Sequence, residues 1–177
     1  VLTMNANVTN ITIESMTLTG GSAVSGGAIY MDAGSSLTTK NAEISNNNAI
    51  SGAAVYAVQG ASLTLINTAM SGNNTDSHGG AIYLADNGTV LNLINSTLRG
   101  NYTSGESAQG GAIYALNGAT VNTVNSTLSG NKTIGNFSAG GAVRLDNATG
   151  NFYNSTIVGN AAAGTTGGVS ANSSVNF

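Results

Sequence analysis

Short runs of alternating aliphatic and polar residues recur along the whole chain, separated by Gly, Asn and Asp. One kind of run is Ala-Ile-Tyr-Met at 28–31, with counterparts near 54, 81, 112 and 142. A second resembles Ser-Leu-Thr-Leu-Ile at 62–66, and a third resembles Ser-Thr-Leu-Ser at 126–129. Alternation over four or five residues predicts β-strands. No window of eleven residues holds a helical period, so we expect an all-β protein.

The three runs recur in the same order with a period of about 27 residues. Gly-Gly-Ala-Ile-Tyr marks this period at 26–30, 79–83 and 110–114, and looser copies lie at 52–56, 140–144 and 167–169. A period of this size means stacked supersecondary units. Three strands per coil, each pairing with its copy in the next coil, predict a parallel β-helix of about six coils. The crossover rule favours the right hand. Residues 1–177 then form one domain.

Side chains along a strand alternate between its two faces, which assigns an inside and an outside to each run. We expect three aliphatic columns inside the solenoid. They are Ile29, Val55, Ile82, Ile113 and Val143; Leu37, Leu63, Leu91 and Val121; and Ile44, Met70, Leu98, Leu128 and Ile157.

The opposite parity places an aromatic column outside, in the first strand of each coil. Its members are Tyr30, Tyr56, Tyr83 and Tyr114, and Arg144 continues it. One interpretation is a ladder of rings that stack coil on coil. The other is a platform for sugars or for a neighbouring chain. A second exposed column, Ile66, Ile94, Val124 and Tyr153, is apolar, and contiguous apolar surface tends to mark an interface.

Two columns of Asn run through the repeat. The first is Asn41, Asn67, Asn95, Asn125 and Asn154, and the second follows each of these by six residues, at Asn47, Asn73, Asn101, Asn131 and Asn160. We expect the first column to lie at the bend between the second and third strands, where stacked amides hydrogen-bond along the axis. The second column opens the segment of variable length, which predicts surface loops.

Twelve Asn-x-Ser/Thr sequences, the acceptor motif for N-glycosylation, occur along the chain. Those in the first Asn column are expected to be too enclosed for modification. The candidates that open or occupy the variable loops are Asn73, Asn101, Asn131 and Asn136, where a glycan has room.

Charge is scarce and scattered. The chain has 4 basic and 7 acidic residues and a net charge of −3, so no basic stripe is available for nucleic acid or for an anionic membrane surface. No apolar run approaches 18 residues, so we expect no membrane insertion. The absence of Cys excludes a disulfide scaffold.

Enzymatic chemistry is not expected from these side chains. Asp32 and Asp146 hold equivalent positions four coils apart, about 19 Å at the inter-strand spacing, whereas a glycosidase needs carboxyls about 5–9.5 Å apart. Asp86 lies one residue out of register with them. Arg144 and Asp146 are expected to form a solvated surface pair. His78 is the only histidine, and we expect it to be exposed in a loop without partners for a metal site. No catalytic residue, metal ligand or cofactor is therefore assigned.

The Gly-Gly-Ala-Ile copies, together with endings such as Leu98-Arg99-Gly100-Asn101 and Leu128-Ser129-Gly130-Asn131, resemble a known repeat. It is similar to the repeat of the chlamydial polymorphic outer-membrane proteins and of related adhesin-like β-helix proteins. That family has Phe where this chain has Met70, Leu98, Leu128 and Ile157, which favours the broader adhesin-like class. The resemblance implies secretion, surface display and an adhesive or structural role. Possible partners are then surface glycans or cell-surface proteins.

The two ends of the chain suggest self-assembly. The chain opens with Val1, which suggests a processed secreted protein or an excised segment. Neither end carries a polar cap, so open strand edges and core are expected at both. The residues expected to meet are Val1, Leu2 and Met4 at one end and Val169, Val175 and Phe177 at the other. We expect an extracellular structural or adhesive solenoid that joins head to tail into a filament. The alternatives are an excised segment of a larger surface adhesin and a polysaccharide-binding or polysaccharide-cleaving β-helix.

Overall fold

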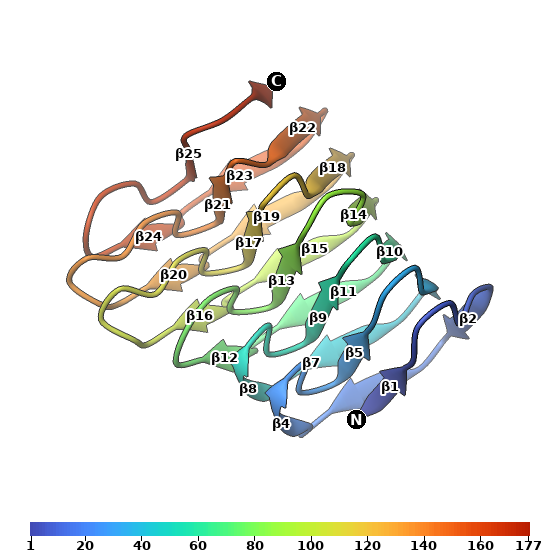
Figure 1. Cartoon of the computed structure of the whole chain (residues 1–177). Helices are drawn as coiled ribbons and strands as arrows, with labels where there is room; N and C mark the ends of the chain where they lie inside the picture. The colour runs from blue at the N-terminus through green and yellow to red at the C-terminus, as the bar shows by residue number, and fades with distance from the viewer.

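The computed structural model describes all 177 residues and contains 26 strands and no helix. The strands form parallel sheets that wind into a β-solenoid of about six turns, with the two termini at opposite ends of the stack (Figure 1). The prediction of an all-β parallel β-helix is confirmed.

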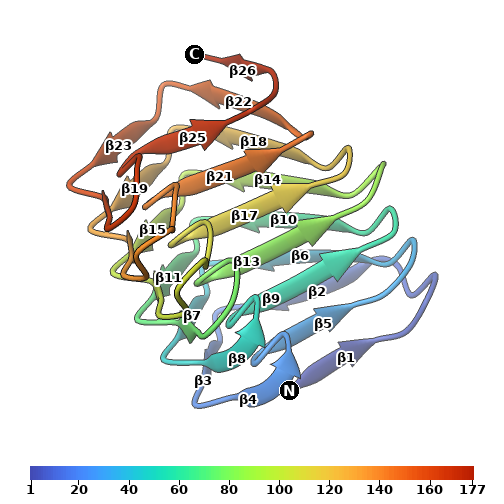
Figure 2. The same cartoon turned by 60° about the vertical axis from the view of Figure 1, so that its left-hand side comes forward.

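Four sheets run the length of the stack. Sheet 1 contains β1 (Leu2–Met4), β5 (Ile29–Met31), β9 (Val55–Val58), β13 (Ile82–Ala85), β17 (Ile113–Leu116), β21 (Val143–Asp146) and β25 (Val169–Ala171). Sheet 2 contains β2 (Ile11–Glu14), β6 (Ser36–Lys40), β10 (Ser62–Ile66), β14 (Val90–Ile94), β18 (Thr120–Val124), β22 (Thr149–Tyr153) and β26 (Val175–Asn176). Figure 2 shows sheet 1 in front and sheet 2 behind it.

The third sheet follows the corner marked by the first Asn column. Sheet 3 contains β3 (Thr17–Thr19), β7 (Glu43–Ser45), β11 (Ala69–Ser71), β15 (Thr97–Arg99), β19 (Thr127–Ser129) and β23 (Thr156–Val158). These strands are the third run of the repeat.

A fourth sheet departs from the expected three strands per coil. Sheet 4 contains β4 (Ser22–Ser25), β8 (Asn48–Ser51), β12 (Asn74–Thr75), β16 (Tyr102–Thr103), β20 (Lys132–Thr133) and β24 (Ala161–Ala162). The sequence signal is weak because most of these strands are only two residues long and have polar inward positions such as Thr75 and Thr103. The segment that was expected to be loop is therefore partly strand.

The aliphatic columns lie inside, as their parity predicts. Ile29, Val55, Ile82, Ile113 and Val143 occupy matching positions in sheet 1 and have no exposed surface. The columns of sheets 2 and 3 are equally enclosed up to Ile157, which is partly buried. Burying each such side chain contributes about 1.5–3 kcal/mol.

The Gly-Gly pair that marks the repeat has two separate physical reasons. Gly79 adopts a left-handed backbone conformation (φ +67°), which glycine tolerates without cost. Gly80 instead leaves no space: a Cβ there would lie 2.0 Å from the carbonyl oxygen of Gly111 in the next coil. The motif is therefore a signature of close coil-to-coil packing where sheet 4 turns into sheet 1.

The second Asn column forms the main polar ladder of the interior. Asn73, Asn101 and Asn131 have no exposed surface. The Nδ2 of Asn73 donates to Oδ1 of Asn101 at 2.9 Å, and Asn101 donates in turn to Asn131 at 3.0 Å. The same Oδ1 atoms also accept backbone N–H groups: the N–H of Asn73 donates to Asn101 at 3.1 Å. The remaining amide hydrogen of Asn101 donates to the carbonyl of Met70. Each amide thus satisfies backbone groups that a sharp buried bend leaves without partners.

A hydroxyl ladder repeats this arrangement beside the first Asn column. The N–H of Thr68 donates to Oγ of Ser96 at 3.0 Å, and the N–H of Ser96 donates to Oγ of Ser126 at 3.1 Å. All three residues are buried. Both corners that flank sheet 3 are therefore held by polar side chains that bond to the coil above or below.

Replacing Asn101 with Ala is expected to destabilise the protein by about 3 kcal/mol or more. The change removes the acceptor of the Asn73 N–H and of one amide hydrogen of Asn73, and it removes the donor to the carbonyl of Met70. Each buried unsatisfied group costs about 1–3 kcal/mol. Asn95→Gly is the matched control, because glycine keeps the left-handed conformation (φ +49°) and Asn95 makes no side-chain hydrogen bond. Urea unfolding followed by circular dichroism measures both variants. Equal stability of the two would contradict the role of the buried ladder.

Candidate functional site

The first Asn column lies at the predicted corner, but it is a surface feature. Asn41, Asn67, Asn95, Asn125 and Asn154 are all exposed. Only two pairs bond along the axis: Asn67 to Asn41, and Asn154 to Asn125. All five have φ between 45° and 50°, a conformation that Asn tolerates better than most residues. The expectation of an enclosed amide ladder here is wrong, because the outward turn needs the left-handed backbone rather than the amide bonds.

Three of the four glycosylation candidates are enclosed. Asn73, Asn101 and Asn131 are the members of the buried ladder, so the expectation that they open exposed loops is wrong. The chain leaves the stack only after them and after the short strands of sheet 4. Asn136 is exposed, and its Nδ2 lies 3.5 Å from Oε1 of Glu106.

The tyrosine column of sheet 1 is a stack of rings on the outer face. Tyr30 and Tyr56 have centroids 5.6 Å apart and an interplanar angle of 5°, and Tyr56 and Tyr83 have centroids 4.7 Å apart and an angle of 6°. Tyr114 tilts by 58° from Tyr83 and is buried. Because each ring covers its neighbour, the stack presents ring edges and hydroxyls to solvent. This geometry favours the ladder interpretation and leaves few ring faces for sugars.

Burial weakens the acidity of these phenols. Burial, followed by the nearby Tyr56 and Asp86, raises the pKa of Tyr83 to about 12. The pKa of Tyr56 is raised as well, by burial, Tyr30 and Asp86. Tyr56 and Tyr83 therefore stay protonated at ordinary pH and supply hydroxyl donors rather than a base.

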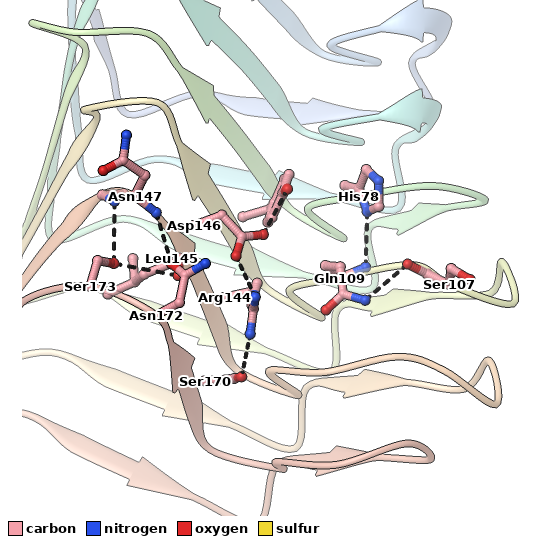
Figure 3. Close-up of polar contacts among 12 residues, drawn as sticks. His78, Ser107, Gln109, Arg144, Leu145, Asp146, Asn147, Ser170, Asn172 and Ser173 are labelled. Carbon is pink, nitrogen blue, oxygen red and sulfur yellow. Dashed lines mark hydrogen bonds and ion pairs between the residues drawn. The ribbon is translucent and has the colours of Figure 1, made fainter.

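Tyr114 ends the stack inside a cluster that crosses three coils. Figure 3 shows Arg144, Asp146 and Ser170 of this cluster. Its hydroxyl donates to Oδ2 of Asp146 at 3.0 Å. Arg144 forms an ion pair with the other oxygen of Asp146 and donates from Nη1 to Oγ of Ser170 at 2.8 Å. Burial and the bond to Asp146 raise the pKa of Tyr114. The Arg144–Asp146 pair was expected to be a solvated surface contact, but these side chains are only 22% and 26% exposed.

His78 packs against the same cluster. Its ring centroid lies 4.7 Å from that of Tyr114, and its Nδ1 accepts the N–H of Gln109 at 3.0 Å. Because Nδ1 accepts, the neutral ring carries its proton on Nε2. Burial lowers the pKa of His78, and Asp146 partly opposes that effect. The expectation of an exposed loop histidine is wrong, since the loop folds onto the neighbouring coil.

The charged side chains of this cluster bond to other members of the cluster. Both oxygens of Asp146 are engaged, by Tyr114 and by Arg144. No second carboxylate is bonded into it, and no three His, Asp or Glu side chains converge anywhere to hold a metal ion. The Nε of Arg144 is buried without a partner. The arrangement can fix the backbone of successive coils and can orient the loop that carries His78.

The outer face of sheet 2 carries the second exposed column. Val124 and Tyr153 are 36% and 53% exposed, while Ile66 and Ile94 are partly covered. Beside it runs an amide column that the sequence interpretation missed: Asn122 donates to Asn92 at 2.9 Å, and Asn151 donates to Asn122 at 2.8 Å. The sequence signal that could have revealed this amide column is the recurrence of Asn two residues before Ile94, Val124 and Tyr153.

The residues named for assembly lie on the first and last coils. At the first coil, Met4 is buried, Leu2 is partly buried and Val1 is 66% exposed. At the last coil, Val169 and Val175 pack partly against the core. Phe177 is 83% exposed and its ring stacks on that of Phe152 at 5.7 Å.

Comparison with protein-family models, with curated proteins and with solved structures gave no match. No helix with the length and apolar character of a membrane span is present.

Protonation of His78 is expected to destabilise the fold. Burial favours the neutral ring, so the folded pKa lies below the usual 6.5. The stability that this depression contributes is present above pH 6.5 and is lost as the pH falls through the folded pKa. Because His78 is the only histidine, its proton NMR signals titrate without overlap. A midpoint at or above 6.5 would contradict the packing described here. His78→Asn is the non-titrating control for unfolding measured against pH.

Glycosylation in a eukaryotic secretory host is expected at Asn136 and absent from Asn73, Asn101 and Asn131 in the folded protein. The three buried amides bond to the next coil and have no room for a glycan, whereas Asn136 is exposed. Glycopeptide mass spectrometry of the soluble fraction gives the occupancy of each site. Occupied Asn101 in protein with the native circular dichroism spectrum would contradict this expectation.

Proposed function

We propose that the chain is an extracellular structural and adhesive β-solenoid that associates head to tail into a surface filament. The observation that carries the proposal is that sheets 1 and 2 continue through every coil of the stack. Their outermost strands are β1 and β2 at one end and β25 and β26 at the other, and the outer edges of these strands pair with no strand of this chain. Strand edges of this kind are templates for pairing with another chain. Sheets 3 and 4 have six strands each rather than seven, so a joint through sheets 1 and 2 leaves the place of one strand open in each of them.

Pairing between copies would continue the contacts that already join one coil to the next. Leu2 and Val169 belong to the same inward column of sheet 1, so they become neighbours when β1 of one copy pairs with β25 of another. A contact between unlike ends does not close on itself, so it produces a filament rather than a ring. The low charge of the chain offers little repulsion to oppose it.

The extracellular and adhesive assignment is supported by the Gly-Gly-Ala-Ile repeat and its likeness to adhesin-like surface proteins. The alternative is a section of a larger cell-surface adhesin, in which neighbouring coils of the same polypeptide occupy these edges. A polysaccharide-cleaving solenoid is the second alternative. The internal bonding of Tyr114, Arg144 and Asp146 disfavours it, because these groups are committed to one another.

Filament growth is expected in concentrated solutions of the 177-residue chain, with a repeat of about 34 Å per subunit, because sheets 1 and 2 each contribute seven strands at the inter-strand spacing. Electron microscopy and sedimentation measure it. Thr3→Pro is expected to abolish growth, because proline at the middle of β1 removes an edge N–H and obstructs pairing. Thr3→Val is the matched control and should still assemble. A monodisperse monomer at every concentration would sink the filament and favour the larger adhesin.

Catalysis is tested separately. The chain is incubated with acidic polysaccharides, and the products are examined for unsaturated ends. Their formation by the unmodified chain and their loss in Tyr114→Phe would replace the proposal with the cleaving alternative.

A further inference from the structure

Over four successive coils, the corner between sheet 1 and sheet 2 shortens by one residue from each coil to the next. Six residues lie between the paired positions Leu84 and Leu91, and five lie between Ala115 and Val121. Four lie between Leu145 and Gly150, and three between Ala171 and Val175. The turns at this corner therefore become shorter from coil to coil, while the strands of sheets 1 and 2 on either side stay in register.

This shortening produces a cleft of about 560 Å³. The longer turns contribute Asn87 and Gly118 to one wall, and the shorter turns contribute Asn147 and Asn172 to the other. Figure 3 shows Asn147, Asn172 and Ser173 on adjoining coils. Hydrogen bonds from backbone N–H groups to side chains of the next coil hold the short turns in place. The N–H of Asn147 donates to Oδ1 of Asn172 at 2.9 Å, and the N–H of Ala148 donates to Oγ of Ser173 at 3.2 Å.

The cleft gathers polar groups that have no partner within the chain. The side-chain amides of Asn87 and Asn147, the Nδ2 of Asn172, and the hydroxyls of Thr120 and Thr149 make no hydrogen bond there. Each amide offers a donor and an acceptor side by side, and each hydroxyl offers both. The only apolar residue in the lining is Ala148, so an apolar ligand would gain little from entering.

The absence of charge in the cleft lining favours a neutral ligand. No residue that lines the cleft is charged. Arg144 and Asp146, beside the short turns, neutralise each other. Asp86, which precedes Asn87, is close enough to Tyr56 and Tyr83 to raise their pKa values. A bound anion would thus lose water without gaining a cation.

We propose that this cleft binds a neutral saccharide chain, whose hydroxyls pair with the amides of Asn87, Asn147 and Asn172. A neutral sugar presents alternating hydroxyl donors and acceptors, which is the chemistry the lining offers. The site rests on the proposed adhesive role and names the class of surface glycan that it would engage. The affinity of one cleft is weak, with a dissociation constant on the order of 1 mM, because its hydrogen bonds replace bonds to water.

The test is an NMR titration of the isotope-labelled full-length chain with neutral hexasaccharides of β-1,4-glucan, α-1,4-glucan and β-1,4-mannan. We expect at least one of them to shift the side-chain amide signals of the three cleft Asn residues and to leave those of Asn41 and Asn67 unchanged. Asn147→Gly removes one amide and keeps the left-handed turn (φ +49°), so it is expected to weaken binding by at least about fivefold. Asn95→Gly makes the same change at the far corner and should bind as the unmodified chain does.

Several results would overturn the cleft. They are the absence of shifts at tens of millimolar saccharide, equal binding by Asn147→Gly, and shifts centred on the tyrosine column instead. A hexagalacturonate that binds more tightly than every neutral chain would also overturn it, because its carboxylates have no partner in the lining. Filaments that bind no saccharide would overturn this inference and leave the assembly proposal intact. Saccharide binding by a chain that stays monomeric would support the cleft and overturn the assembly proposal.

Discussion

Parallel pairing of each coil with the next is the constraint on which the rest of this structure depends. A single coil has too small a core to be stable alone, and its inward side chains pack against equivalent positions above and below as part of one continuous core. The Asn73–Asn101–Asn131 ladder follows the same rule, since each amide completes the bends of its neighbours. Stability in such a stack is a sum of coil and interface contributions, so a defect in one coil is felt mainly by the coils that touch it.

This constraint explains the unusual composition of the chain. A buried charge has no partner in a column of identical positions, because its neighbour would carry the same sign. Neutral polar groups that both donate and accept can repeat without conflict, and Asn, Ser and Thr have that property. The chain accordingly uses amides and hydroxyls at its buried corners and has only 11 charged residues.

The repeat is broken at two places that lie side by side. Arg144 replaces a tyrosine in the outer column and gathers Asp146, Tyr114 and Ser170. The turns after β13, β17, β21 and β25 lose one residue at a time and open a polar cleft. The two departures adjoin each other, because Asp146 ends β21 and Asn147 begins the next turn. A regular rod thus carries one irregular region near its last coils.

The sequence alone determined the repeat, the strands of sheets 1 to 3 and the aliphatic columns, because alternation and period depend only on local spacing. It also placed the corner at Asn41 and its copies. The tertiary structure decided which Asn column is buried: both columns look alike in sequence, and only the path of the chain after Asn73 shows that its amide points inward. It likewise decided the fourth sheet, in which four of the six strands are only two residues long and carry no alternation. The packing of His78 on Tyr114 and the shortening corner between sheets 1 and 2 depend on contacts between coils about 30 residues apart, so no local pattern reveals them.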